Sequence, residues 1–345
     1  MRILTKLHSS NTMVATSSIL HLLGSIGEAE PFTLTEVQGG FNNRAFRVDT
    51  GEKRYLLKEY FRDGQDSRDR LGAEYGFCKF ASTLGVGGVA KPFACDTDED
   101  IGLYEFIEGV NCRPEDVTLQ RVLEAANFYK RLNEQRDCPA AKELGKASEA
   151  CFSIEEHLGC VTQRVARLAA IPTDNPLDQR AIRFAQESLA IRVHEVKEAY
   201  AQSGIAGPIG TDEYSLSPSD FGFHNMLVDH EGSLRFVDFE YAGWDDPSKM
   251  VADFFNQPRI PVPVRWMDAF VQEALGGQTW ADGAMQRIQL LYPLYRVKWC
   301  CIIMNEFLPE GNRRRAFSTN QATLEERKLA KLEAAENYLT NTPQL

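Results

Sequence analysis

The distribution of apolar residues changes near residue 107, and this change constrains the fold more than any other feature. Before it, short β-like runs are separated by glycine turns, with one helical segment around Asp66–Leu84. The clearest runs are Phe32–Val37, Ala45–Val48 and Tyr55–Tyr60. Beyond Gly109, apolar residues recur at steps of three and four, which is typical of amphipathic helices, apart from a β-rich island at Tyr214–Phe239. The pattern predicts an α+β chain, with a small β-rich lobe (residues 1–107) before a larger, mostly helical lobe (residues 108–345).

Charge and cysteine content exclude several classes of protein. Asp and Glu outnumber Lys and Arg by 49 − 38 = 11, whereas binding along a nucleic-acid backbone needs a basic face, so we expect no nucleic-acid partner. No stretch reaches about 18 apolar residues, so we expect no membrane span. The eight cysteines contain no C-x-x-C pair, and the N-terminal residues turn polar where an export signal would be apolar. We expect reduced thiols and a cytoplasmic location, as a monomer or homodimer.

The central island carries the side chains that most suggest chemistry. Met226–Asp229 and Leu234–Phe239 flank the turn His-Glu-Gly-Ser, a pattern that predicts a β-hairpin. Because a hairpin brings its ends together, Asn225 and Asp238 should lie side by side. Their oxygens are hard ligands that can hold Mg²⁺ while it keeps phosphate oxygens and water. Asp220 would lie close by and could accept a proton from an attacking hydroxyl; the alternative is that all three residues merely cap turns.

Two features of the small lobe indicate an anion site. Gly39 and Gly40 lie between two strand-like runs, where the lack of side chains lets backbone N–H groups approach a phosphate. An ordinary hairpin turn would suit these glycines equally well. Lys58 lies among apolar neighbours in the next run, and a half-buried lysine needs an anionic partner. The alternative for Lys58 is a solvated position on an edge strand.

The central island resembles a known family of small-molecule kinases. Asp220 and Asn225 form a D-x4-N pattern, and the hairpin that follows ends in D-F-E-Y-A-G-W-D-D-P, Asp238–Pro247. This arrangement is similar to the aminoglycoside phosphotransferase/choline kinase family. The resemblance implies a two-lobed protein-kinase-like fold, with a small β-rich N-lobe and a larger, mostly helical C-lobe.

The small lobe carries the other parts that the resemblance implies, in the family's order. The stretch Asn43-x-x-Phe46-x-Val48 is similar to the family's N-x-x-aromatic-x-Val pattern. The family's lysine, here Lys58, holds the α- and β-phosphates of ATP and pairs with a helix glutamate, here Glu74. The stretch Leu103–Gly109 resembles the hinge whose backbone bonds adenine. The residues that the resemblance assigns to ATP are Gly39, Gly40, Phe41, Asn43, Lys58, Glu74, Glu105, Phe106 and Ile107.

The chain departs from the family pattern at two positions. The family has a histidine two residues before the catalytic aspartate, where this chain has Pro218. That histidine is mainly architectural, so its loss bears on the geometry of the loop. Downstream, Met250 stands where the family usually has an aspartate, and Asp253 is the nearest substitute.

Four residues are candidates for an acceptor site. Glu240 lies two residues beyond the metal-site aspartate and would share its face in an extended chain. Tyr295 and Trp299 share one helix face, and Glu306 follows seven residues later on a similar side. Such aromatic residues could stack on a sugar or surround a quaternary ammonium, and core packing is the alternative. His224 adjoins the D-x4-N asparagine, but neighbouring side chains of an extended segment point to opposite faces, so we interpret it as a packing or surface residue.

Together these features predict an ATP- and Mg²⁺-dependent phosphotransferase that moves the γ-phosphate to a hydroxyl of a small molecule. Asp220 would be the catalytic base, and Asn225 and Asp238 would bind Mg²⁺. The acceptor remains open between a sugar or aminocyclitol, which suits an acidic chain, and an amino alcohol such as choline, which suits the aromatic residues. The alternative is a catalytically inactive kinase-like nucleotide-binding or scaffold protein, which Pro218 suggests.

Overall fold

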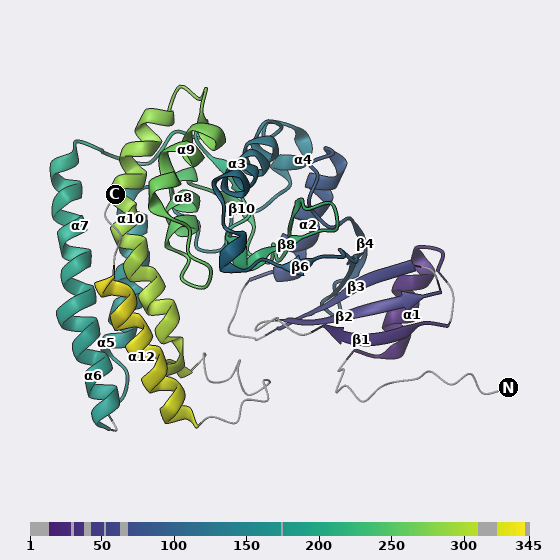
Figure 1. Cartoon of the computed structure of the whole chain (residues 1–345), viewed down its shortest axis with the longest axis horizontal. Helices are drawn as coiled ribbons and strands as arrows, with labels where there is room; N and C mark the ends of the chain where they lie inside the picture. Colours follow the sequence, from purple (N-terminus) through teal and green to yellow (C-terminus); the bar gives the residue numbers. More distant parts are fainter. Residues whose placement is uncertain are drawn as a thin grey trace.

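The structure is a computed structural model that describes residues 14–28, 31–37, 43–51, 53–62, 68–173, 175–309 and 323–341. A small lobe built on a β-sheet lies beside a larger helical lobe (Figure 1). The expected α+β plan, with the sheet first and the helices after it, is confirmed.

A five-stranded antiparallel sheet forms the small lobe. In spatial order its strands are β1 (Thr33–Val37), β2 (Asn43–Thr50), β3 (Lys53–Tyr60), β5 (Ile101–Glu105) and β4 (Pro92–Asp96). Because β3 is the central strand, Lys58 pairs with Ala45 on one side and with Gly102 on the other. Lys58 is only 7% exposed, which excludes the alternative of a solvated edge-strand lysine.

Successive side chains of these strands point to opposite faces of the sheet, so each face has its own partner helix. One face packs against α1 (Thr16–Ser25) through a core that includes Phe46, Val48, Leu57 and Leu103. The other face carries Tyr60 and Tyr104 and packs against α2 (Arg70–Thr83). Lys58 therefore points to the α2 side of the sheet.

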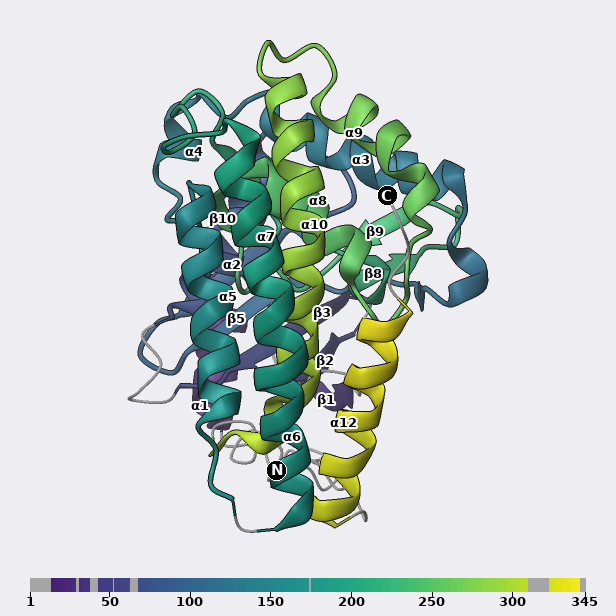
Figure 2. The same ribbon diagram turned by 90° about the vertical axis from the view of Figure 1, so that its left-hand side faces the viewer.

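The large lobe is mostly helical, as its apolar periodicity predicts. Its helices are α3 (Leu119–Asn133), α4 (Pro139–Lys142), α5 (Ile154–Ala169), α6 (Pro176–Phe184), α7 (Ala190–Ser203), α8 (Pro247–Asn256), α9 (Met267–Leu275), α10 (Ala281–Ile303) and α12 (Leu324–Thr340), with the short turns η1 (Pro114–Asp116), η2 (Ala185–Leu189), η3 (Phe223–Asn225), η4 (Val264–Trp266) and η5 (Met304–Phe307). The long helix α10 packs against α5, α7, α8 and α12 (Figure 2). None of the helices in the described ranges is long and apolar enough to cross a bilayer.

The three strands of the β-rich island join two strands from outside it to form two small sheets within the helical lobe. One contains β6 (Val110–Asn111), β8 (Met226–Val228) and β9 (Leu234–Phe236), and the other contains β7 (Ser215–Ser217) and β10 (Gly243–Asp245). Strands β8 and β9 pair antiparallel, so the predicted hairpin is confirmed. The backbone N–H of Phe236 donates to the carbonyl of Gly88 at 2.7 Å, which links β9 to the turn after α2.

One hydrophobic core runs through both lobes. It extends from Tyr60 and Tyr104 on the sheet, through α2, to α3, the hairpin and α8. Within it the rings of Phe77 and Phe239 stack with centroids 4.6 Å apart. This stacking holds α2 against the segment that follows the hairpin, and so positions charged residues on both elements.

Candidate active site

Lys58 is the centre of a buried charged cluster between the lobes. Its Nζ donates to Glu74 Oε2 at 2.6 Å and to Asp238 Oδ1 at 2.9 Å. Glu74 also accepts from the Tyr60 hydroxyl at 2.8 Å, and Tyr60 contacts the hydroxyl of Tyr104 at 2.8 Å. The pairing of Lys58 with Glu74 that the resemblance implies is present, while the role of both residues toward ATP stays a prediction.

The two carboxylates keep Lys58 charged in spite of its burial. Burial alone would lower the pKa of the Lys58 ammonium, but the charges of Asp238 and Glu74 outweigh it and raise this pKa above its ordinary value. Burial raises the pKa of the Glu74 carboxyl, and the positive charge of Lys58 opposes that rise. The cluster therefore holds one ammonium against two carboxylates, one of them partly open to solvent: the Asp238 side chain is 39% exposed.

Asp238 owes its position to an unusual backbone conformation and to the residue that follows it. Its φ of 68° lies in the left-handed region, where residues other than glycine are uncommon. Phe239 then stacks on Phe77, which lies one helical turn after Glu74 on α2. The sequence Asp-Phe thus aims the carboxylate at Lys58 while the ring anchors the segment in the core.

Asp220 and Asn225 lie together at the entrance to the hairpin. Asn225 Nδ2 donates to the carbonyl oxygen of Asp220 at 2.9 Å and approaches its carboxylate Oδ2 at 3.4 Å. The carbonyl of Asn225 accepts from the N–H of Val237 at 3.1 Å, so the residue next to Asp238 is bonded to Asn225. This backbone contact brings the two ends of the hairpin together, while the shared role of the Asn225 and Asp238 side chains at a metal stays a prediction.

The Asp220 carboxylate is stabilised in its charged form. Burial would raise its pKa, but His224, Lys298 and the amide of Asn225 outweigh burial and hold the pKa below its usual range. The closest of these contacts joins His224 Nε2 to Asp220 Oδ1 at 3.3 Å. Asp220 is thus a carboxylate at neutral pH, and its side chain stays 35% exposed.

The conformation expected around His224 is wrong, while its role as a packing residue stays untested. The sequence predicts an extended segment, whereas Phe223–Asn225 form the helical turn η3, in which His224 and Asn225 both reach the carboxylate of Asp220. The local signal was weak, because a three-residue turn has no periodicity to read.

Glu240 turns toward the small lobe. It is 3% exposed, accepts from Asn43 Nδ2 at 2.8 Å, and lies 3.4 Å from Arg70 Nε. Asn43 begins β2 and Arg70 begins α2, so Glu240 ties the segment after the hairpin to both elements. Its proposed contact with metal or substrate stays a prediction.

The remaining nucleotide-site predictions concern the loop and the hinge. Gly39, Gly40 and Phe41 lie outside the described residues. Glu105 is the last residue of β5, and Phe106 and Ile107 follow it in the connection to β6.

The aromatic residues proposed for the acceptor site lie deep in the helical lobe. Tyr295 is 1% exposed, its hydroxyl contacts His157 Nδ1 at 2.8 Å, and Lys298 Nζ lies 4.7 Å from its ring centroid. Trp299 is 8% exposed, and Glu306 is 1% exposed with Arg327 Nε 3.7 Å from its carboxylate. These positions agree with the core-packing alternative more closely than with an open wall.

The two departures from the family pattern have local replacements. Met250 is buried in the core, whereas Asp253 forms an ion pair with Lys298, with oxygen–nitrogen distances of 2.7 and 2.9 Å. At the other departure, Pro218 is buried, and the N–H of Ser219 donates to Ser217 Oγ at 3.0 Å. A serine hydroxyl therefore bonds the backbone of the loop that leads to Asp220.

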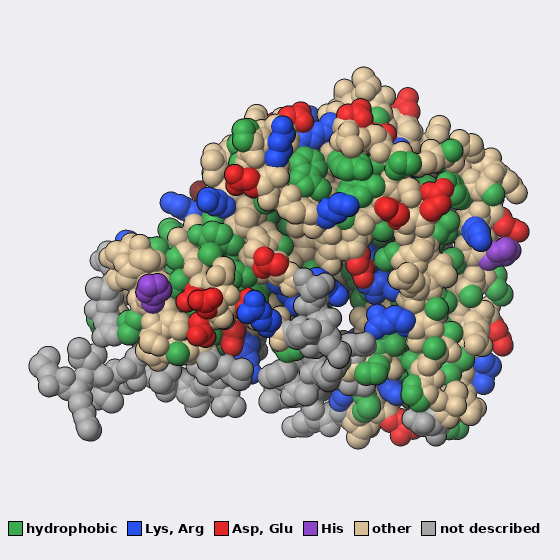
Figure 3. Space-filling view, turned by 180° about the vertical axis from the view of Figure 1, so that it is seen from behind, with side chains coloured by type: hydrophobic (Ala, Val, Ile, Leu, Met, Phe, Trp, Pro, Cys, Tyr) green, Lys and Arg blue, Asp and Glu red, His purple; other side chains and the backbone are tan. Residues whose placement is uncertain are grey.

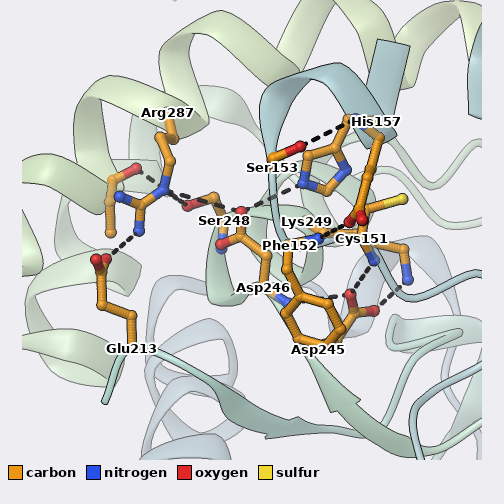
Figure 4. Close-up of polar contacts among 12 residues, drawn as sticks. Cys151, Phe152, Ser153, His157, Glu213, Asp245, Asp246, Ser248, Lys249 and Arg287 are labelled. Atoms are coloured by element: carbon orange, nitrogen blue, oxygen red, sulfur yellow. Dashed lines mark hydrogen bonds and ion pairs between the residues drawn. The ribbon is translucent and has the colours of Figure 1, made fainter. Parts of the chain in front are cut away.

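A buried polar network lies next to the site, and its two aspartates belong to the Asp238–Pro247 motif, in which they had no assigned role. In Figure 4, Asp245 and Asp246 lie at its centre, between His157 on one side and Arg287 on the other. Asp246 caps α8 by accepting from the N–H of Ser248 at 2.7 Å, and it lies 3.2 Å from His157 Nε2. The network joins α5, α8 and α10. Its central residues, Asp245 and Asp246, follow Asp238 closely in the chain.

Asn225 and Asp238 fit a magnesium ion whose remaining coordination positions are filled by phosphate oxygens and water. No group of three or more His, Cys, Asp or Glu that could hold a metal occurs in the described part of the chain. Asn225 and Asp238 would supply two hard oxygens, and Mg²⁺ commonly takes one or two protein carboxylates and completes its shell with phosphates and water. On the face shown in Figure 3, Lys and Arg side chains lie near the junction of the small lobe and the large lobe.

Comparison with known proteins agrees with this architecture. The chain resembles a spectinomycin phosphotransferase in complex with ADP and spectinomycin, at 17% identity and a TM-score of 0.63, over 95% of this chain and 99% of that one. An ethanolamine kinase from Plasmodium vivax has 14% identity and a TM-score of 0.60, over 96% and 92%. A choline kinase from Streptococcus pneumoniae has 15% identity and a TM-score of 0.57, over 94% and 99%. At these identities the likeness shows the fold, which is the expected two-lobed kinase-like fold.

The sequence itself also matches a family. No curated protein matches the chain. Residues 33–286, which span every described element from β1 into α10, match the model of the phosphotransferase enzyme family. With the charged cluster and the hairpin in the order that this fold requires, the chain belongs to the phosphotransferase enzyme family.

Proposed function

We propose that this protein is an ATP- and Mg²⁺-dependent phosphotransferase that moves the γ-phosphate of ATP to a hydroxyl of a small molecule. The observation that carries the proposal is the cluster in which Lys58 Nζ lies 2.6 Å from Glu74 and 2.9 Å from Asp238. Asp238 comes from the hairpin that also carries Asp220 and Asn225. Phosphoryl transfer requires a cation for the phosphates, a carboxylate for the metal and a separate carboxylate for the acceptor. In this proposal Lys58, Asp238 and Asp220 supply these groups.

In this proposal Lys58, held by Glu74, binds the α- and β-phosphates of ATP. Asn225 and Asp238 would hold Mg²⁺, which neutralises charge on the transferring phosphoryl group. The glycine loop would cover the phosphates, and the backbone at Glu105, Phe106 and Ile107 would bond adenine.

Asp220 would act on the acceptor. Its lowered pKa keeps it a carboxylate at neutral pH, and its exposed oxygen can accept a hydrogen bond from a hydroxyl. His224 and Asn225 contact the carboxylate and would hold its orientation. The carboxylate would then direct the acceptor hydroxyl toward the γ-phosphate.

The structure removes one argument for an amino alcohol and otherwise leaves the proposed acceptor open between a sugar, an aminocyclitol and an amino alcohol. The ring of Tyr295, which was a candidate for binding an ammonium, already has Lys298 Nζ 4.7 Å from its centroid. Lys298 also contributes to the lowered pKa of Asp220, so a cation lies near the proposed base. Asp253 pairs with this cation, so Lys298 gives no ground for excluding a charged acceptor.

A thermal-shift and turnover series tests the proposal. Mg²⁺ and ATP together should raise the melting temperature by more than either does alone, and ATP consumption should rise with one member of a panel of sugars, aminocyclitols and amino alcohols. A shift without turnover on any acceptor would support the inactive nucleotide-binding protein instead, and no shift at all would support a scaffold. Within this proposal residues 1–107 are the nucleotide-binding lobe, residues 108–345 carry the acceptor site, and the enzyme works in the cytoplasm as a monomer or homodimer.

A further inference from the structure

Two buried tyrosines continue the charged cluster into the small lobe. Tyr60 lies two residues after Lys58 on β3, and Tyr104 lies on the neighbouring strand β5. Their hydroxyl oxygens are 2.8 Å apart, and the hydroxyl of Tyr60 is also 2.8 Å from Glu74 Oε2. The tyrosine pair therefore ends at the carboxylate that holds Lys58.

The direction of these hydrogen bonds follows from the number of protons. An ionised carboxylate can only accept, so Tyr60 donates its single hydroxyl proton to Glu74. Tyr104 must then donate its own proton to the oxygen of Tyr60. Glu74 Oε2 accepts from two side chains, Tyr60 at 2.8 Å and Lys58 at 2.6 Å. A carboxylate oxygen that is held in this way by two donors has little freedom to turn away from Lys58.

A glycine provides the space for the Tyr104 ring. Gly102 and Tyr104 are two residues apart on β5, so a side chain at either position faces the α2 side of the sheet. A Cβ atom on Gly102 would lie 2.6 Å from Cε2 of Tyr104 and 2.7 Å from its hydroxyl, so the ring lies across the glycine. Gly102 is also the residue that pairs with Lys58 across the two strands. The strand opposite Lys58 therefore leaves the room that the Tyr104 hydroxyl needs to reach Tyr60.

We propose that Tyr60, directed by Tyr104, is a positioning residue that holds the Glu74 carboxylate in place while Lys58 binds phosphate. This role rests on the proposed function, in which Lys58 binds the α- and β-phosphates of ATP. Lys58 donates to both Glu74 and Asp238, and a bound phosphate would compete with Asp238 for the ammonium. Glu74 would then remain on the ammonium, and the Tyr60 hydroxyl would fix where that carboxylate lies.

Nucleotide binding to the full-length protein tests this role without an acceptor. Tyr60→Phe keeps the ring and removes only the hydroxyl. The Kd of Mg·ADP should rise by about three- to tenfold, less than the full value of a hydrogen bond to a charged group, because the effect reaches ADP through Lys58. The Kd of adenosine, which has no phosphate to contact Lys58, should not change. Calorimetry measures both ligands, with adenosine in competition with Mg·ADP.

Tyr55→Phe is the matched control. Tyr55 is a buried residue of the same strand and donates to Glu28 Oε1 at the same distance of 2.8 Å, but it belongs to the core on the α1 side of the sheet. The two substitutions therefore remove the same group from equivalent contacts, and Tyr55→Phe should leave both Kd values unchanged. Tyr104→Phe keeps the Tyr60 hydroxyl but removes the group that directs it. Its Kd for Mg·ADP should lie between those of the wild type and Tyr60→Phe.

The outcomes separate this role from the proposed function. A wild type that binds neither Mg·ADP nor Mg·ATP would overturn the proposed function and the role of Tyr60 with it. If the wild type binds Mg·ADP and Tyr60→Phe binds it equally well, only the role of Tyr60 is overturned. Equal losses of Mg·ADP and adenosine affinity would also overturn it, since the hydroxyl would then act on the fold as a whole. If Tyr60→Phe does not fold, the same comparison with Tyr104→Phe decides.

Discussion

Two buried lysines in this molecule differ in what surrounds them. Lys298 meets one carboxylate, Asp253, and both side chains are 10% exposed. Lys58 meets two carboxylates, and one of them, Asp238, is 39% exposed. A closed pair of one charge against one is satisfied and holds the fold together, whereas an open cluster with a second carboxylate can still take up a cation or exchange partners. Exposure and charge balance, more than burial alone, separate a structural ion pair from a candidate site.

The largest effect on turnover should come from removing the partly exposed carboxylate of Asp220. Asp220→Asn keeps the size of the side chain but removes the proposed base and one of its two accepting oxygens, so turnover should fall by about 10²- to 10⁴-fold. Steady-state ATP consumption measures this, with the Mg²⁺- and ATP-dependent thermal shift as the control for nucleotide binding. Turnover that equals the wild-type rate would remove Asp220 from the mechanism.

A substitution in the closed pair of Lys298 and Asp253 should change the stability of the protein more than its turnover. Asp253→Ala leaves the Lys298 ammonium buried without its carboxylate, which should lower the free energy of unfolding by about 3–5 kcal/mol. Urea denaturation followed by fluorescence measures this loss. A decrease below about 1 kcal/mol would mean that Lys298 finds water or another partner, and that the pair is not closed.

The matched substitution in the open cluster should leave stability almost unchanged. Asp238→Ala removes one of two carboxylates from Lys58, which stays paired with Glu74, so the free energy of unfolding should change by less than about 1 kcal/mol. The part of the nucleotide thermal shift that needs Mg²⁺ should disappear. If that part persists, Asp238 does not hold the metal.

The smallest effect should be a shift in pH dependence. In the wild type the lowered pKa of Asp220 places the acidic fall of kcat/KM below the ordinary aspartate value of about 3.9. His224→Leu removes the nearest group that lowers this pKa, so the pKa rises and the fall moves to higher pH. His224→Gln, which can still donate a hydrogen bond, should restore part of the difference. An unchanged profile in the leucine variant would show that His224 has only a packing role.

Much of the site could be predicted from local patterns. The turn between two apolar runs predicts the hairpin, and a hairpin necessarily brings Asn225 close to Asp238. The apolar neighbours of Lys58 predict a largely buried lysine with an anionic partner, and Glu74 is such a partner. These predictions succeed because they depend on residues only a few positions apart.

Predictions that needed distant contacts were incomplete. Nothing in the sequence around Lys298 indicates that α10 would bring it to Asp253 and near Asp220. Glu240 shares a short segment with Asp238, yet it bonds Asn43, almost two hundred positions earlier in the chain. Tyr295 and Glu306 have helical spacing that suits either a core or a pocket, and only packing decides between them.

By itself the sequence determined the order of the elements, the hairpin and the types of side chain that could meet at its base, because period and turn chemistry act over a few residues. The tertiary structure alone decided which charges are closed into pairs and which remain open. Asp238 and Asp253 are the same residue type, but the first follows a hairpin and keeps a partly exposed side chain, whereas the second pairs with Lys298 between α8 and α10. Solvent access and charge balance are properties of the assembled fold, so they cannot be predicted from the residues next to either aspartate in the sequence.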